Sequence, residues 1–225
     1  MISIYNELQI RKNESDNLIV FLEQIEHNRF HFDEETSINV TSLRTTLKST
    51  TIIVLYNSVE SLITQCLTKI HNEIIRDNLL FENININLKK LFMHYYEKAI
   101  ANCSNQVKIV EYKYDYLQLT GNKEQIKISY SDIISHYSLF SGNLDSRKIK
   151  DVLSKYGLSF DVAESVLKTI KTYRNQLAHG EKSFEEVGRE LSVPQLRAMH
   201  TRTFDYLNAV ADAVRQFISN KDYRS

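Results

Sequence analysis

Residues 47–70 read LKSTTIIVLYNSVESLITQCLTKI and carry the strongest periodic signal in the chain. Apolar or small side chains return every three or four positions, the spacing that places them on one face of an α-helix. The residues of this stripe are Leu47, Thr51, Val54, Leu55, Ser58, Val59, Leu62, Cys66 and Ile70. The segment therefore predicts a helix of about 30 residues that buries one face against other helices.

Glycine and proline are scarce across the whole chain. Only one proline and five glycines occur among 225 residues, so few positions favour a break in a helix. Further helices are expected at residues 4–26 (as one helix or two short ones), 88–100, 146–156, 160–178 and from Ser192 onward. Ser183 with Glu186, and Ser192 with Gln195, match the capping-box pattern of helix starts. We expect one all-α domain over residues 1–225, an up-and-down bundle of five or six helices.

Residues 85–140 have a different pattern of polar and apolar residues and are expected to form an insertion into the bundle. Residues 107–114 and 125–130 partly alternate between polar and apolar, and they flank the turn-forming residues 120–122. This pattern is typical of a short β-hairpin, although loops and helix ends fit it nearly as well. The insertion is a candidate for specificity toward a substrate or partner. Its tyrosines could stack on unpaired bases or form a small core of their own.

The charge balance limits the ways in which this chain can bind nucleic acid. It has 28 basic and 28 acidic residues, so it is not expected to coat nucleic acid through bulk electrostatics, which requires many clustered cations. A local groove is still compatible with a neutral chain. One basic cluster could guide a phosphate backbone, or it could be an ordinary solvated helix face. Its members are Arg147, Lys148, Lys150, Lys155, Lys168, Lys171 and Arg174. Arg174 belongs to the motif described next, and Lys168 and Lys171 lie nearest to it.

Several other classes of protein are not expected from this sequence. No apolar run approaches the roughly 18–20 residues of a membrane span, and no signal-peptide pattern opens the chain. Cys66 and Cys103 lack metal-ligand spacing and indicate a reducing cytoplasm. His27 and His31 are four residues apart, but no glutamate accompanies them in the arrangement of a zinc protease. We therefore expect a cytoplasmic protein with no metal and no membrane association.

One short segment combines a permanent cation with a group that gains or loses a proton near neutral pH. It is Arg174-Asn175-Gln176-Leu177-Ala178-His179-Gly180, at the end of the helix expected at 160–178. An arginine can neutralise charge on phosphoryl oxygens, and a histidine can move the proton of an attacking or leaving oxygen. Such a pair can cleave an RNA phosphodiester without a metal ion.

The position of Arg174 on its helix restricts what the side chain can contact. It falls near the middle of the apolar stripe, so its guanidinium must face a carboxylate, a polar cleft or a second subunit. Glu60 is the expected partner, as an orienting carboxylate or as half of a plain ion pair, and Tyr56 shares its flank at i,i+4 spacing. His179 would point about 140° away from Arg174 if the helix continued. Gly180 is expected just past the helix end, where His179 could swing or meet an arginine of a second chain.

The spacing in this segment resembles the signature of the HEPN superfamily of helical ribonucleases. An asparagine follows the arginine, four residues separate arginine from histidine, and the segment ends in Ala-His-Gly. Two further segments share the resemblance, Tyr56-Asn57-Ser58-Val59-Glu60 and Ser141-Gly142-Asn143-Leu144-Asp145. Together the three are similar to the prokaryotic branch found in toxin–antitoxin and antiphage systems.

The resemblance implies a metal-independent endoribonuclease without a cofactor, which acts on RNA as a homodimer with one cleft between two motif helices. It implies that Arg174 stabilises charge on the phosphorane, that His179 is the general acid or base, and that Asn175 holds the phosphate or the geometry of the site. A partner protein, either an antitoxin or a sensor, is also implied. Some HEPN toxins carry a tyrosine two residues past the histidine that an antitoxin modifies. This chain has Glu181 there, so silencing by that route is not expected.

A non-catalytic alternative fits the same residues. Arginines that face a bundle are often half of a buried ion pair, and a histidine at a helix C-terminus can simply favour the helix dipole. In that case the chain is a helical dimerisation or interaction module of a defence complex, and it cleaves no RNA.

Overall fold

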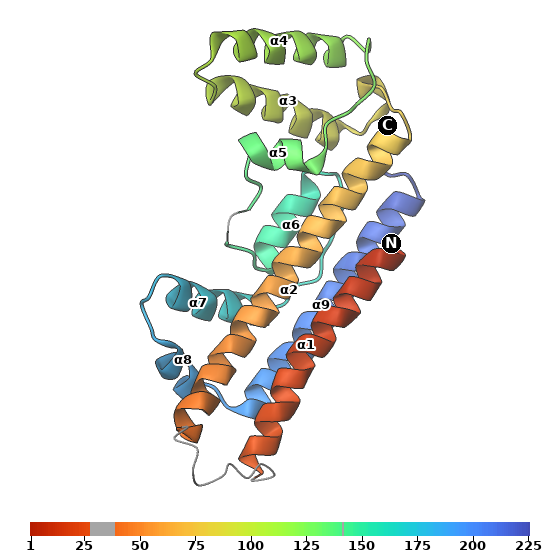
Figure 1. Cartoon of the computed structure of the whole chain (residues 1–225). Coiled ribbons are helices and arrows are strands. Elements are labelled where there is room, and N and C mark those ends of the chain that lie inside the picture. The colour runs from red at the N-terminus through yellow and green to blue at the C-terminus, as the bar shows by residue number, and fades with distance from the viewer. Residues whose placement is uncertain (28–38, 141) are drawn as a thin grey trace.

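The structure is a computed structural model that describes residues 1–27, 39–140 and 142–225. Within these residues the chain forms nine α-helices and one short 3-10 helix, and no strand is present (Figure 1). The elements are α1 (Ile2–Glu26), α2 (Val40–Arg76), η1 (Phe81–Asn83), α3 (Ile86–Ala101), α4 (Gln106–Thr120), α5 (Tyr130–His136), α6 (Ser146–Ser154), α7 (Val166–Ala178), α8 (Phe184–Glu190) and α9 (Val193–Ser219). None of the helices in the described ranges has the length and apolar character needed to cross a membrane.

The predicted all-α fold is confirmed, but the expected count of five or six helices is wrong. The segment 85–140 contributes three helices instead of one helix and a possible hairpin, and the short α8 precedes the last helix. The capping boxes of α8 and α9 form as the sequence predicts, with Ser183 bound to Glu186 and Ser192 bound to Gln195.

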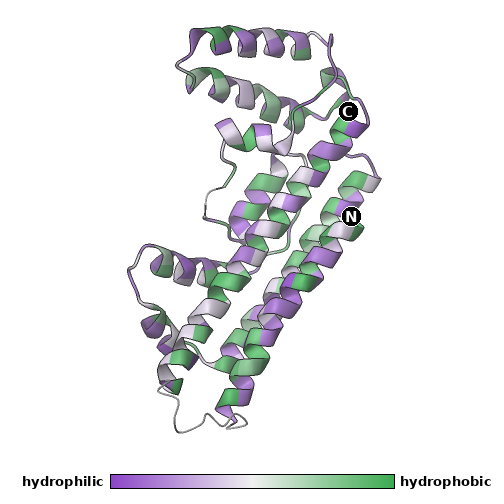
Figure 2. Ribbon diagram, viewed as in Figure 1, coloured by the Kyte–Doolittle hydropathy of each residue, from purple (hydrophilic) through white to green (hydrophobic). Residues whose placement is uncertain are grey.

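Three long helices, α1, α2 and α9, run side by side and form the core of the bundle (Figure 1). Apolar and polar positions alternate along each of them, as expected of amphipathic helices (Figure 2). α2 has 37 residues and begins where the Asn39 side chain accepts a hydrogen bond from the Ser42 backbone N–H. Its predicted stripe is buried: Thr51, Leu55, Ser58, Val59, Leu62, Cys66 and Ile70 are at most 2% exposed. Leu47 and Val54 are only partly buried.

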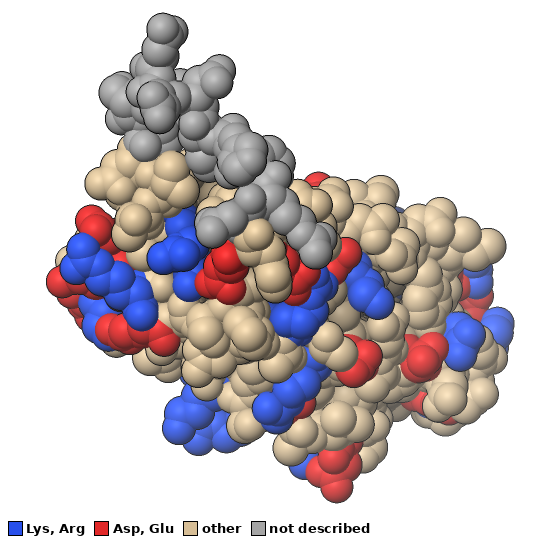
Figure 3. Space-filling model, turned by 90° about the horizontal axis from the view of Figure 1, so that it is seen from below, with Lys and Arg blue, Asp and Glu red and all other residues tan. Residues whose placement is uncertain are grey.

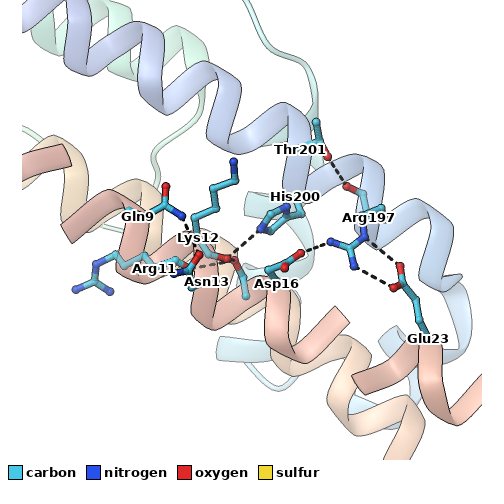
Figure 4. Close-up of polar contacts among 10 residues, drawn as sticks. Gln9, Arg11, Lys12, Asn13, Asp16, Glu23, Arg197, His200 and Thr201 are labelled. Carbon is cyan, nitrogen blue, oxygen red and sulfur yellow. Dashed lines mark hydrogen bonds and ion pairs between the residues drawn. The ribbon is translucent and has the colours of Figure 1, made fainter. Parts of the chain in front are cut away.

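A polar clamp joins α1 to α9 on the side of the bundle that Figure 4 shows. The Arg197 guanidinium of α9 donates from Nε and Nη2 to the two carboxylate oxygens of Glu23, at 3.0 Å each, and it also contacts Asp16. The His200 ring, 3% exposed, lies with Nε2 3.2 Å from the Lys12 carbonyl. Burial lowers the pKa of His200, so this ring is neutral and donates to that carbonyl. The clamp fixes α1 against the helix that also supports α7.

The motif helix α7 begins at Val166, later than the start at residue 160 that the sequence predicts. Phe160 is buried, and its ring centroid lies 5.5 Å from that of Tyr206 on α9, so this stretch follows the surface of α9 instead of coiling. The Glu164 carboxylate accepts from the Val166 N–H at 2.9 Å and pairs with Arg202 of α9. These anchors set where α7 starts and how it faces α2.

The possible β-hairpin is also wrong, because residues 107–114 lie within α4. The inward side chains of α4 are Tyr112, Tyr116 and Leu119, whose spacing of four and three is that of a helix packed against α3. Val107, Val110 and Tyr114 point outward instead and are exposed. A helix that is apolar on two sides gives the appearance of alternation, and that misled the prediction.

Candidate functional site

Arg174 is half-buried on α7 and is held by groups that carry no charge. Its guanidinium lies over the ring of Tyr56 on α2, with Cζ 4.6 Å from the ring centroid, a distance at which cation and aromatic face attract. Nη1 donates to the Gly142 carbonyl at 3.2 Å and to Asn175 Oδ1 at 3.1 Å. Among the described residues, no carboxylate forms an ion pair with Arg174. Its positive charge is therefore oriented but not neutralised.

Tyr56 separates Arg174 from Glu60. The Tyr56 hydroxyl donates to Glu60 Oε1 at 3.1 Å and accepts from the Leu144 backbone N–H at 3.0 Å. The side chain is only 1% exposed, and burial, reinforced by the Glu60 carboxylate, raises its pKa to about 12. The phenol is therefore neutral and able to donate. Glu60, the expected direct partner of Arg174, instead acts on it through this tyrosine.

A loop at 142–145 closes over Arg174 from the other side. Gly142 has a φ of +60°, a conformation that favours glycine, and a Cβ at that position would lie 2.8 Å from Arg174 Nη1, so the guanidinium would have to shift. The next residue, Asn143, accepts from Asn175 Nδ2 at 3.3 Å. Leu144 is buried and supplies the N–H that binds Tyr56. Ser141, which belongs to the segment that carries the resemblance, lies outside the described residues.

Lys171 and Lys168 are in different surroundings, although both were candidates for binding a phosphate backbone. Lys171 pairs with the Asp145 carboxylate, which also accepts the Lys148 N–H at 2.9 Å to cap α6. Burial opposes ionisation of Asp145, but the bonds to Lys171 and Lys148 outweigh it and lower the pKa of Asp145. Lys168 is exposed and forms no ion pair with a described residue. Of these two lysines, only Lys168 has an ammonium group that is not paired with a carboxylate of a described residue.

Most of the basic cluster near the motif is neutralised by neighbouring acids. Lys148 and Lys155 pair with Asp151, and Lys150 pairs with Asp161. Figure 3, which views the molecule from below, shows basic and acidic side chains interspersed on that face. Any phosphate bound at this site therefore depends on a few local cations.

His179 occupies the end of α7 and is exposed. It is the C-cap residue, and Gly180 follows with a φ of +68°, the left-handed conformation that the sequence predicts. The Gly180 N–H bonds to the Leu177 carbonyl at 3.3 Å and the Glu181 N–H bonds to the Gln176 carbonyl at 2.9 Å, which completes a Schellman motif. No hydrogen bond joins the His179 ring to a described residue. Arg174, Asn175 and Tyr56 are thus brought together in one chain, and His179 is not among them.

A shallow groove, which the sequence did not predict, lies along α7. It has a volume of about 450 Å³ and is lined by Lys168, Thr169, Thr172, Tyr173, Gln176, Lys182 and Glu190. Thr172, Gln176 and His179 follow one another at helical spacing, so they share one face of α7. Gln176 Oε1 is buried and has no hydrogen-bond donor among the described residues. The spacing of 168, 172, 176 and 179 was the available signal for this face.

Metal ligation has no candidate in the part of the chain that the structure describes: no group of three or more His, Cys, Asp or Glu side chains is arranged to hold an ion. His31, one member of the histidine pair noted in the sequence, lies outside the described residues.

Comparison with known families agrees with the resemblance found in the motif. The model of the MAE_28990-like HEPN family matches residues 2–223. No curated protein and no solved structure matches the chain. Because the family match spans nearly the whole chain, the protein belongs to the HEPN superfamily.

Proposed function

We propose that this chain is a metal-independent endoribonuclease whose motif residues Arg174, Asn175 and His179 act directly on RNA. The observation that carries the proposal is the state of Arg174. Its guanidinium has no carboxylate partner among the described residues and is held by the Tyr56 ring and the Gly142 carbonyl. A purely structural arginine facing a bundle is normally neutralised by an acid. A half-buried cation without one is suited to binding an anion such as a phosphate.

The reaction is an internal transfer at phosphorus. The 2′-oxygen of one nucleotide forms a bond to the adjacent phosphorus, the bond from phosphorus to the 5′-oxygen of the next nucleotide breaks, and a base accepts the 2′-hydroxyl proton. An acid donates a proton to the leaving 5′-oxygen, which leaves a 2′,3′-cyclic phosphate and a 5′-hydroxyl end. Arg174 stabilises charge on the phosphorane, Asn175 orients the phosphate, and His179 moves one of the two protons.

The side chains of Arg174 and His179 must reach the same phosphate, and a homodimer would allow this. Within one chain Arg174 faces α2 and the loop at 142–145, whereas His179 is exposed at the end of α7. A two-fold axis that passes beside α7 would set the exposed His179 of one copy near Arg174 of the other. The groove lined by Lys168, Tyr173 and Gln176 would then bind the RNA nucleotides next to the scissile bond.

A cleavage assay tests the proposal. Wild type should fragment total RNA in EDTA and leave 2′,3′-cyclic phosphate ends, and His179→Ala and Arg174→Ala should each abolish cleavage. His27→Ala is a matched control, because His27 is also an exposed C-cap residue, at the end of α1. Cleavage that requires magnesium, or that survives His179→Ala, would overturn the mechanism. RNA left intact by a folded wild-type dimer would favour the interaction-module alternative.

The biological setting belongs to the same proposal: a cytoplasmic toxin or defence effector that an antitoxin or sensor protein controls. Both cysteines are free, which fits a reducing compartment. Induction of the wild-type chain in a bacterial host should arrest growth, and His179→Ala should not. Equal growth of the two strains at equal protein levels would contradict a toxin role.

A further inference from the structure

α4 exposes a continuous apolar stripe on its outer face. Val107, Val110, Tyr114 and Leu117 are 68%, 64%, 58% and 64% exposed, respectively. The opposite face of the same helix already packs against α3. α4 is the outermost helix at its end of the molecule (Figure 1). Single exposed apolar residues are ordinary on protein surfaces, but four in a row on one helix face indicate a contact surface.

The spacing within the stripe indicates what kind of element covers it. The four residues are separated by three, four and three positions, which is the a and d pattern of a coiled-coil seam. Such a narrow seam accepts knobs from one helix lying along it. A strand or a flat surface does not have this periodicity. The occupant is therefore a helix that is close to parallel or antiparallel to α4.

We propose that this helix is α4 of a second copy of the chain, antiparallel to the first and related by a two-fold axis that meets the outer face of α4 at the level of residue 112. The stripe is symmetric about that residue, because 107 and 117, like 110 and 114, are equally far from 112. An antiparallel copy in this register places Val107 opposite Leu117 and Val110 opposite Tyr114. Each small side chain then meets a larger one, which fills the seam evenly. A self-complementary surface of this kind is what an isologous dimer requires.

The charges of α4 are compatible with self-association. The helix carries Lys108, Glu111, Lys113 and Asp115, which sum to zero, and none forms an ion pair with a described residue. Asp115 lines a pocket with Tyr95 and Tyr96 of α3, and Lys108 lies on the same side of the helix, so neither charge borders the stripe. Glu111 and Lys113 each approach their own counterpart near the axis. Both are exposed, so water and salt screen these like-charge pairs.

The size of the surface sets the expected strength. The four side chains of the stripe can bury a few hundred Å² on each copy. The total over both copies is less than the roughly 1,200 Å² of a stable specific interface. The contact should therefore be weak and should depend on protein concentration. It is separate from the contact proposed beside α7 and does not depend on RNA cleavage.

Sedimentation and cross-linking of the full chain test the proposal. Wild type should associate further as its concentration rises, and Leu117→Glu should weaken this association about tenfold or more, since it places a charge in the seam. Ile2→Glu is the control, because Ile2 is an apolar residue on α1 that is more exposed (81%) than Leu117. Unchanged association of Leu117→Glu would overturn the proposal.

Cross-linking determines the orientation. In a Cys103→Ser background, Glu111→Cys lies beside the axis and should give a covalent dimer with a short bis-maleimide. Gln118→Cys lies on the same flank but about 18 Å from its counterpart along the helix, so it should stay monomeric. Cys66 is fully buried and should not react. No dimer from Glu111→Cys, or equal dimer yields from both variants, would overturn the antiparallel pairing.

Discussion

Replacing Tyr56 with phenylalanine removes one oxygen atom and keeps the ring under Arg174. The hydroxyl is the only described partner of the Leu144 N–H and donates to Glu60, at 3.0 Å and 3.1 Å respectively. Glu60 is half-buried and can turn to water, whereas Leu144 is 1% exposed and its N–H would stay unsatisfied. A buried donor without a partner costs about 1–3 kcal/mol. The loop at 142–145 should therefore loosen.

This cost should be visible in thermal melting. For a chain of this size each kcal/mol lowers Tm by about 2–4 °C, so Tyr56→Phe should melt several degrees below wild type. Tyr95→Phe is the matched control: Tyr95 is comparably buried at 7% exposure, but its hydroxyl has no hydrogen-bond partner among the described residues. It should melt within about 1 °C of wild type. Equal melting of Tyr56→Phe and Tyr95→Phe would refute the bridging role of the Tyr56 hydroxyl.

Four further predictions concern the site, the core and the assembly. Arg174→Ala should abolish cleavage and change the free energy of unfolding by no more than about 1 kcal/mol, since the variant loses mainly a partly exposed cation–π contact. Urea melts that show a loss of several kcal/mol, together with intact cleavage, would assign Arg174 a structural role. Gly142→Ala should destabilise the chain by about 1–2 kcal/mol and reduce cleavage, because the φ of residue 142 is +60° and the added Cβ crowds Arg174. A variant with full activity and full stability would show that the loop at 142–145 can shift freely. His71 is buried, and burial lowers its pKa from 6.5 to about 4, so between these pH values the folded chain binds fewer protons than the unfolded chain. His71 therefore contributes about 3 kcal/mol of stability that is complete above pH 6.5 and is lost as the pH falls to 4. Urea melts of wild type and His71→Gln across this pH range measure the loss. Light scattering at micromolar concentration should give about twice the mass of one chain, and a strict monomer would contradict a composite site.

The sequence predicted those features that local periodicity and capping determine. The buried face of α2, the left-handed Gly180 and the capping boxes at Ser183 and Ser192 follow from residue spacing within one element. The inward position of Arg174 also followed from the helical period. What it contacts did not, because Tyr56 and Gly142 come from elements far apart in sequence, and their approach depends on how α2 and α7 cross.

The errors have equally specific causes. α7 starts late because Phe160 packs on Tyr206, a tertiary contact that overrides a helical pattern. The possible hairpin over 107–114 and 125–130 is absent because residues 107–114 belong to α4, which is apolar on two faces. Over eight residues, a period of two cannot be separated from two stripes of period 3.6. The pairing of Lys171 with Asp145 was also out of reach of the sequence, since it joins α7 to the start of α6.

The continuity of α2 has a mechanical consequence. Tyr56 lies beneath Arg174, and His71 on the same helix binds the Ile128 carbonyl and the Tyr156 hydroxyl, at 2.8 Å and 3.0 Å, near the base of the α3–α5 segment. The two residues are about 22 Å apart along the axis, and α2 contains no glycine or proline that would act as a hinge. α2 therefore behaves as a stiff rod. Any turn or slide of this rod moves the support of the guanidinium and the support of the α3–α5 segment together, and neither end can be repositioned alone.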